Sequence, residues 1–214
     1  MKDNKTLSYW NSLYSTENFF GAGPTKLAKI ATEHLNKKNL TILEVGCGQG
    51  RDAIFLSSLG HNVHAFDISE SAVNYVKKLK ISMQLQNLNI FTHDIENPLS
   101  FPNDSFDFVY SNLALQFFDS TKLQQIFTNI SKVIKKNSLF LFSTKKIGDK
   151  YYNFGKKINE HAYEYKGITR YFYPEHELKN LLSTNYEIIF FDDDSHSNLD
   201  STISVWWKIL VRKK

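Results

Sequence analysis

The chain has 214 residues, of which 42% are hydrophobic and 14% aromatic, so it can bury the core of one large domain and is not of the disordered class. Its net charge of +4 is spread along the sequence, without the basic stripe that is typical of nucleic-acid binding. No apolar run approaches the roughly 18 residues of a membrane helix, and the first residues contain no apolar signal segment. The single cysteine, Cys47, excludes an intrachain disulfide and fits a reducing cytoplasm, where we expect the protein.

Helical and strand patterns follow one another in a regular order. Two helices are expected first, at 7–15 and 23–38. Five apolar runs of strand length then alternate with helical segments, and the first of them is nearly all apolar, as a parallel strand buried on both faces should be. The expected strands are 40–45, 61–68, 87–95, 105–112 and 137–144, and the helices between them are 51–60, 69–80 and 121–135.

The pattern changes after the fifth strand. Residues 146–173 are polar and aromatic without clear periodicity. A helix at 174–183 begins at Pro174, and two strands at 185–194 and 201–213 are close enough in sequence to pair antiparallel. We therefore predict an α/β fold with a Rossmann-like, seven-stranded, mostly parallel sheet, helices on both faces and an antiparallel C-terminal strand pair.

Three glycines at alternating positions, Gly46, Gly48 and Gly50, follow the first expected strand. One glycine is enough for a tight turn, whereas three indicate that a ligand approaches the backbone, because no Cβ intervenes. In open parallel sheets, ligands bind beyond the carboxyl ends of the strands, where the next helix also presents free N–H groups. We expect a ligand at this turn.

Asp67 closes the second expected strand, 21 residues after Gly46. A carboxylate at this place can accept hydrogen bonds from both hydroxyls of a ribose, which indicates an adenosine cofactor. The alternative is a residue that caps the next helix, but Ser69 already occupies that position.

The spacing of the glycines separates two cofactor classes. A dinucleotide site has G-x-G-x-x-G, whereas this chain has "EVGCGQG", with Glu44 two positions before the first glycine. This pattern resembles motif I of the class I S-adenosylmethionine-dependent methyltransferases. The resemblance covers roughly residues 40–211 and includes "DISESA", "HDIENPLSFPNDSFDFVYSNLALQFF" and "RYFYPEHELKNLL". "GRDAIFL" and the "AFDIS" that follows are similar to the small-molecule branch with tellurite-resistance and thiopurine-type enzymes.

The resemblance implies S-adenosylmethionine as the cofactor and assigns residues to its parts. Gly46 and Gly48 would lie beside the methionine moiety, and Glu44 would orient the turn or reach the amino group through water. Asp67 would bind the ribose, and Asp94 would accept a hydrogen bond from the adenine amino group. The complete expected set is Glu44, Gly46, Cys47, Gly48, Gly50, Asp67, Ile68, Asp94, Ile95, Asn112 and Leu113.

The resemblance also places two aromatic segments over the methyl group of the cofactor. We expect residues 1–39 to form a portion of a substrate lid and residues 40–214 to form the cofactor-binding core, with 146–173 as an insertion on the substrate side. The expected substrate-pocket residues are Trp10, Tyr14, Gln116, Phe117, Tyr151 and Tyr171. Tyr14, His161 and His176 are candidate bases, although a base is needed only when the acceptor must lose a proton. No metal is expected.

The function expected from these residues is methyl transfer to a small-molecule acceptor by in-line displacement. Two alternatives stay open: a scaffold that binds the cofactor without catalysis, and a methyltransferase that acts on a protein or RNA. A DNA amino-methyltransferase is disfavoured because "SNLALQFF" lacks a proline pair after the fourth strand. An NAD-dependent dehydrogenase is disfavoured by the glycine spacing. The sequence does not reveal the oligomeric state, and no membrane partner is expected.

Overall fold

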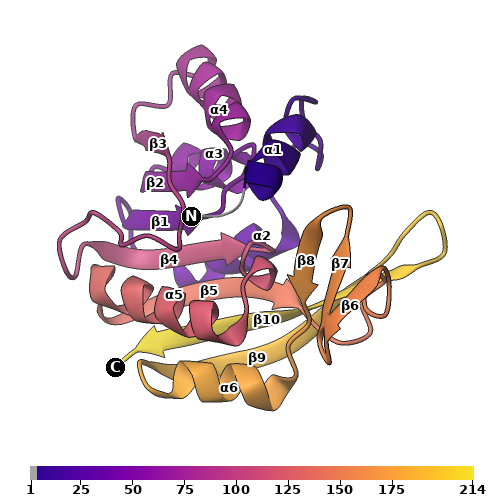
Figure 1. Cartoon of the computed structure of the whole chain (residues 1–214). Coiled ribbons are helices and arrows are strands. Elements are labelled where there is room, and N and C mark those ends of the chain that lie inside the picture. The colour runs from indigo at the N-terminus through magenta and orange to yellow at the C-terminus, as the bar shows by residue number, and fades with distance from the viewer. Residues whose placement is uncertain (1–3) are drawn as a thin grey trace.

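The computed structural model describes residues 4–214; residues 1–3, which belong to the N-terminal segment predicted for the lid, lie outside the described residues. A seven-stranded sheet forms the centre of the molecule, with the strand order β3-β2-β1-β4-β5-β10-β9 (Figure 1). Its strands are β1 (Thr41–Val45), β2 (Asn62–Asp67), β3 (Leu88–Thr92), β4 (Phe106–Asn112), β5 (Ile134–Lys145), β9 (Tyr186–Ser197) and β10 (Ile203–Lys213).

The first five strands of this sheet pair in parallel, and β10 pairs antiparallel with both β5 and β9. The predicted Rossmann-like sheet with an antiparallel C-terminal pair is therefore confirmed. The order of the strands reverses beside β1, because β2 lies on one side of it and β4 on the other. This reversal defines the place where open α/β sheets bind ligands.

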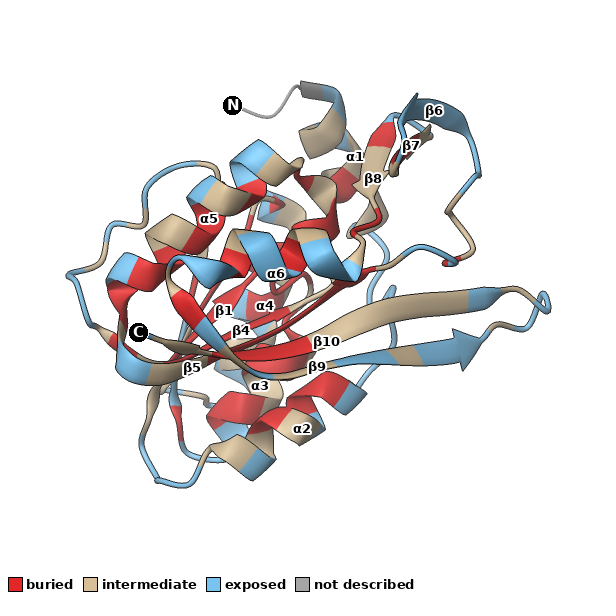
Figure 2. Cartoon of the chain, turned by 90° about the horizontal axis from the view of Figure 1, so that it is seen from below, coloured by how far each residue is buried: buried red, intermediate tan, exposed pale blue. Residues whose placement is uncertain are grey.

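Helices cover both faces of the sheet, and their buried sides face the strands (Figure 2). The helices are α1 (Asn4–Leu13), α2 (Lys26–His34), α3 (Arg51–Ser58), α4 (Glu70–Ser82), η1 (Leu115–Phe117), α5 (Ser120–Val133) and α6 (Glu175–Ser183). Side chains alternate across β1: Ile42 packs with residues of α2, α3 and α4, whereas Leu43 and Val45 pack with residues of α5 and α6. The apolar runs read from the sequence thus build two core layers. Among the described residues, no helix has the length and apolarity to span a membrane.

A second, three-stranded antiparallel sheet lies within residues 146–173, where the sequence showed no periodicity. It consists of β6 (Lys156–Asn159), β7 (Ala162–Tyr165) and β8 (Ile168–Tyr171). Each strand has only four residues, and β6 is exposed throughout, so there is no run of alternating apolar residues to detect. Aromatic packing holds this small sheet instead, as between Tyr163 and Phe172.

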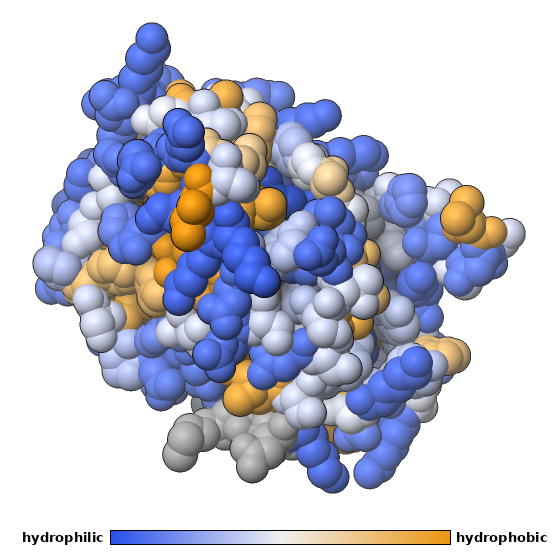
Figure 3. Space-filling view, turned by 90° about the horizontal axis from the view of Figure 1, so that it is seen from above, coloured by the Kyte–Doolittle hydropathy of each residue, from blue (hydrophilic) through white to orange (hydrophobic). Residues whose placement is uncertain are grey.

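The small sheet and α1 lie at the end of the molecule to which β1, β4 and β5 point (Figure 1). Helix α1 lies near α4, and β8 lies against η1. Seen from above, apolar side chains form several small patches among hydrophilic ones (Figure 3). The two segments that the sequence analysis expected on the substrate side therefore both stand at the carboxyl ends of the parallel strands.

Candidate functional site

A cavity of about 1190 Å³ opens at the carboxyl ends of the parallel strands. The last residues of three strands line it: Asp67 of β2, Asn112 of β4 and Lys145 of β5. A drug-sized ligand occupies a pocket of roughly 300–1,000 Å³, so this cavity can hold a nucleoside and a second small molecule.

The glycine turn forms one wall of the cavity through Gly46, Cys47 and Gly48. All three glycines have positive φ angles, of 70°, 52° and 72° for Gly46, Gly48 and Gly50, which other residues adopt only with strain. A Cβ on Gly46 would lie 2.4 Å from the Cβ of Ala114, so the turn is also closely packed against the protein.

Gly50, which the sequence analysis assigned to the cofactor, does not line the cavity. It is the left-handed N-cap of α3, and a Cβ there would lie 2.6 Å from a methyl group of Val76. The close approach of α4 and the backbone conformation explain this glycine without a ligand.

The carboxylate of Asp67 holds the glycine turn in place. It accepts hydrogen bonds from the backbone N–H of Gly48 at 2.8 Å and of Ser69 at 2.9 Å. Asp67 also lines the cavity, so its carboxylate lies between the turn and the space for a ligand. Ser69 caps α4 as predicted, because its hydroxyl accepts the N–H of Ala72.

Two further acids beside the turn have contrasting surroundings. Asp52, which is 2% exposed, accepts hydrogen bonds from the backbone N–H and the hydroxyl of Thr25 and from the hydroxyl of Tyr110, at 2.7–2.8 Å. Glu44 is 3% exposed and lines the same cavity, but its Oε2 has no hydrogen-bond partner among the described residues. Burial, with the charges of Asp52 and Asp67, raises the pKa of Glu44. A buried acceptor without a donor indicates a site for a cationic or N–H group.

Most of the other expected cofactor residues also line the cavity. Ile68 and Ile95 belong to its wall, as does Asp94, whose Oδ1 accepts the N–H of Glu96. Burial raises the pKa of the Cys47 thiol, so the group stays protonated and packs in the core.

The loop after β4 completes this side of the wall. The Oδ1 of Asn112 accepts the hydroxyl of Ser143 at 2.6 Å. Leu113 has a φ of 51°, a strained value for a side chain of this size. The amide of Gln116 donates to the carbonyl of Leu113, and its own Oε1 is buried without a partner among the described residues.

The N-terminal segment covers the glycine turn. Trp10 stacks on Tyr14 and meets Phe117 edge-on, with centroids 5.9 and 4.9 Å apart, and all three line the cavity. Gln49 fastens the segment that follows: its amide donates to the carbonyl of Thr16 at 2.8 Å and accepts the N–H of Phe19 at 2.9 Å.

Arg51 adds a second anchor through hydrogen bonds to the carbonyls of Phe20 and Gly23, both at 2.6 Å. The sequence analysis did not find these anchors, although both lie in or next to the glycine motif.

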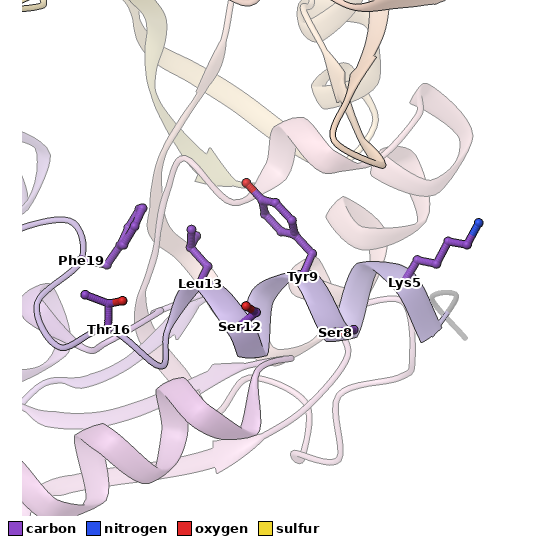
Figure 4. A pocket seen from close by; sticks show the side chains of 7 residues that line it. All are labelled: Lys5, Ser8, Tyr9, Ser12, Leu13, Thr16 and Phe19. Atoms are coloured by element: carbon purple, nitrogen blue, oxygen red, sulfur yellow. The ribbon is translucent and has the colours of Figure 1, made fainter.

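A shallower hollow of about 690 Å³ lies on the outer side of α1, lined by Lys5, Ser8, Tyr9, Ser12, Leu13, Thr16 and Phe19 (Figure 4). The side chains of Tyr9, Leu13 and Phe19 extend to the same side of the segment and also line the large cavity. This segment is therefore a thin wall between the cavity and its surroundings.

Of the three expected bases, Tyr14 lines the cavity and the two histidines do not. His161 packs on Tyr152 and His176 is exposed on α6, and neither lines it. Burial and the charge of Asp67 raise the pKa of Tyr14, so this phenol stays protonated. Among the described residues, no three His, Cys, Asp or Glu side chains are grouped to hold a metal ion.

Of the expected substrate residues, Tyr151 lines the cavity, whereas Tyr171 does not. Successive side chains of a strand point to opposite faces. Because Arg170 lines the cavity, Tyr171 points away from it and packs against the main core. Arg170 and Lys150 were not predicted, since a single cation in an aperiodic segment carries no signal.

Comparisons with known proteins agree with this geometry. Residues 42–137 match a family model described as a methyltransferase domain. A probable S-adenosyl-L-methionine-dependent methyltransferase TehB of Haemophilus influenzae is 29% identical over 91 residues, which are 42% of this chain and 31% of that protein. Malonyl-[acyl-carrier protein] O-methyltransferase 1 of Ilyobacter polytropus is 28% identical over 75% of this chain and 58% of its own length. The matches thus span less than two thirds of these relatives.

Solved structures show the same fold. A SAM-dependent methyltransferase of Methanosarcina mazei has a TM-score of 0.73 at 20% identity, covering 86% of this chain and 96% of that one. TehB of H. influenzae has a TM-score of 0.69 at 18% identity, covering 97% of this chain and 67% of that one. The 1,6-didemethyltoxoflavin-N1-methyltransferase of Burkholderia thailandensis was solved with 1,6-didemethyltoxoflavin and S-adenosylhomocysteine bound. It has a TM-score of 0.68 at 16% identity, covering 88% of this chain and 76% of that one. The domain match, the TehB relative and the shared fold together support a class I S-adenosylmethionine-dependent methyltransferase related to the TehB-type enzymes.

Proposed function

We propose that the chain is a methyltransferase that uses S-adenosylmethionine to methylate a small-molecule acceptor. The observation that carries the proposal is the cavity itself, which joins an acidic end at the glycine turn to an aromatic enclosure. The toxoflavin relative in fold acts on a small molecule, which supports this class of acceptor.

The residues at the acidic end fit the cofactor. The unpartnered Oε2 of Glu44 suits the ammonium group of the methionine moiety, because a buried acceptor needs a donor. Asp67 lines the cavity at the carboxyl end of β2, which is where a ribose is bound in such folds. Asp94 has acceptor capacity for the adenine amino group. The turn Gly46–Gly48 brings the backbone to the cavity wall without a side chain at either glycine.

The chain contributes position and exclusion of water to the reaction. When bound, S-adenosylmethionine supplies an electrophilic methyl group. Trp10, Tyr14 and Phe117 contact one another on the wall of the cavity and present apolar ring surface to it. Alignment of two reactants in such a space can supply effective molarities on the order of 10⁵ M, so a dedicated catalytic group is not required.

The domain organisation belongs to the same proposal. The N-terminal segment, described from residue 4, forms a lid fastened by Gln49 and Arg51. The segment 146–173 walls the opposite side through Lys150, Tyr151 and Arg170. A lid on both sides favours a small acceptor over a folded protein or RNA. A cytoplasmic location, expected from the single cysteine, is a further element of the proposal.

Thermal unfolding with S-adenosylmethionine, S-adenosylhomocysteine or NAD tests the cofactor. A ligand at about 100 times its Kd stabilises the native state by roughly 2.7 kcal/mol, which raises the Tm of a chain of this size by roughly 5–10 °C. We expect this shift with the two sulfur nucleosides and none with NAD. A shift with NAD alone would overturn the proposal. The chain could instead bind S-adenosylhomocysteine but form none of it from S-adenosylmethionine with any acceptor of a panel of small molecules. That result would favour the non-catalytic scaffold.

A further inference from the structure

The end of the cavity opposite the glycine turn is lined by basic side chains. Lys145 stands at the carboxyl end of β5, Lys150 follows it, Arg170 comes from β8 and Lys208 from β10. The charges of Lys150 and Arg170 both act on the pKa of Lys145, which burial lowers and Asp149 raises. Lys145, Lys150 and Arg170 are therefore close enough to repel one another, and negative charge is needed to offset this repulsion.

Carboxylates in the protein offset only half of this charge. Lys145 pairs with Asp149 at 2.5 Å in a buried ion pair, and Lys208 lies 3.9 Å from Asp194. Among the described residues, no carboxylate oxygen lies within 4.0 Å of the cationic nitrogens of Lys150 or Arg170. Two cations that line the cavity without a carboxylate within this distance can bind an anion there.

Aromatic rings hold the guanidinium of Arg170 in a fixed place. It lies 4.6 Å from the centroid of the Tyr151 ring and 5.8 Å from that of Phe117. Both rings line the cavity, and the one hydrogen bond that the group makes to a described residue, to the carbonyl of Ile168, is long at 3.4 Å. An arginine fork with free N–H groups that is fixed in advance suits the two oxygens of a planar carboxylate.

The position of Arg170 connects this end of the cavity to the lid. The ring of Phe117 contacts both the guanidinium of Arg170 and the ring of Trp10. The rings of Tyr151, Phe117 and Trp10 thus line one continuous space. A flat molecule bound to Arg170 by one edge would extend along these rings toward the glycine turn.

We propose that the methyl acceptor is a planar organic anion whose carboxylate is bound by Arg170 and Lys150. This inference rests on the proposed function, because it assigns the other end of the cavity to the cofactor. A carboxylate whose lone pairs are held by two cations is a weak nucleophile. It therefore anchors the acceptor, and the atom that receives the methyl group lies at the other end of the molecule.

Calorimetry on the full chain saturated with S-adenosylhomocysteine tests the proposal. The probes are 4-hydroxybenzoate and 2-naphthoate, each compared with its neutral carboxamide. We expect at least one carboxylate to bind at least tenfold more tightly than its amide, with an affinity that falls as salt is added. Arg170→Gln and Lys150→Gln should each weaken carboxylate binding at least tenfold and leave the amide unchanged. Lys157→Gln removes a positive charge from the exposed β6 of the same small sheet and should change neither.

Three outcomes overturn the proposal. The first is that neither carboxylate binds more tightly than its amide. The second is that Arg170→Gln and Lys150→Gln bind the carboxylate as the wild type does. The third is that Arg170→Gln weakens the binding of S-adenosylhomocysteine, because Arg170 then binds the carboxylate of the cofactor. A wild type that does not bind S-adenosylhomocysteine at all refutes the proposed function instead, so the two failures are distinguishable.

Discussion

Replacement of Glu44 by glutamine should have opposite effects on stability and on cofactor binding. Glu44 is 3% exposed, its Oε2 lacks a partner among the described residues, and Asp52 and Asp67 act on it as like charges. The ligand-free chain therefore keeps an acid in surroundings that disfavour its charge. Glu44→Gln removes the charge and keeps the shape, so the ligand-free protein should become more stable while the partner of the ammonium group is lost.

The two effects have different sizes. A buried carboxylate without a partner costs more when it is charged than a neutral amide does in the same place, and we expect Glu44→Gln to recover about 1–3 kcal/mol at neutral pH. At about 2–4 °C per kcal/mol for a chain of this size, its Tm should rise by roughly 2–12 °C. Loss of one member of a buried charge pair weakens binding by about 2–5 kcal/mol, so the Kd for S-adenosylhomocysteine should increase roughly 30-fold or more.

The stability difference should depend on pH in a defined direction. Because the pKa of Glu44 is raised in the folded chain, the folded state holds this proton more tightly than the unfolded state does. The stability of the wild type therefore falls as the pH rises from the unfolded pKa of about 4.3 through the folded pKa. Glutamine does not titrate, so the advantage of Glu44→Gln should be small near pH 4 and should grow above it.

Urea unfolding at several pH values and calorimetry with S-adenosylhomocysteine measure both effects. Glu160→Gln is the matched control, because the side chain of Glu160 is 85% exposed and neither quantity should change. A Glu44→Gln variant that binds S-adenosylhomocysteine as tightly as the wild type would refute the assignment of the ammonium group. A variant less stable than the wild type would show that the carboxylate is satisfied in the ligand-free chain.

Three further predictions concern the turn and its lid. Asp67→Ala should weaken S-adenosylhomocysteine binding more than tenfold in calorimetry and also lower the free energy of unfolding by about 1–3 kcal/mol, because two backbone N–H groups lose their acceptor; unchanged affinity would contradict the ribose assignment. Gly46→Ala should lower the free energy of unfolding by more than the roughly 1–2 kcal/mol that a left-handed conformation costs an alanine. Ala114→Gly should restore only the part of this loss that comes from the clash with Ala114, which a double-mutant cycle by urea unfolding can measure. Gln49→Ala should speed amide hydrogen exchange in residues 16–20 with little change in Tm, and unchanged exchange would show that Gln49 does not fasten the lid.

The main sheet could be predicted because its strands appear in the sequence as apolar runs that alternate with helical patterns. The run at 40–45 is apolar since β1 is covered on both faces, and Ser69 caps α4 through a local bond. The small sheet could not be predicted in this way. Its strands β6, β7 and β8 are four residues long, and aromatic contacts that have no fixed period stabilise them.

The residues of the candidate site also differ in how far the sequence could predict them. Asp67 was assigned to the ligand by its place at the end of a strand, and Glu44 and Asp94 were assigned by the family resemblance; all three line the cavity. Arg170 and Tyr171 show the limit: the sequence favoured the tyrosine for its type, but only the pleat of β8 decides which neighbour faces the cavity. The bonds of Asp52 to Thr25 and Tyr110 could not be predicted either, since they join residues far apart in the chain.

The opposite charges at the two ends of the cavity explain how one site could hold two ligands in order. A cofactor with a sulfonium and an ammonium group is attracted to Glu44 and Asp67, whereas Lys150 and Arg170 repel it. An anionic acceptor is attracted to Lys150 and Arg170 and repelled by Glu44 and Asp67. Trp10 and Phe117 contact each other on the wall of the same cavity, and each field acts more strongly where a bound ligand displaces water. The charges therefore oppose binding of either ligand in the reversed orientation, so the reacting ends meet at the aromatic rings.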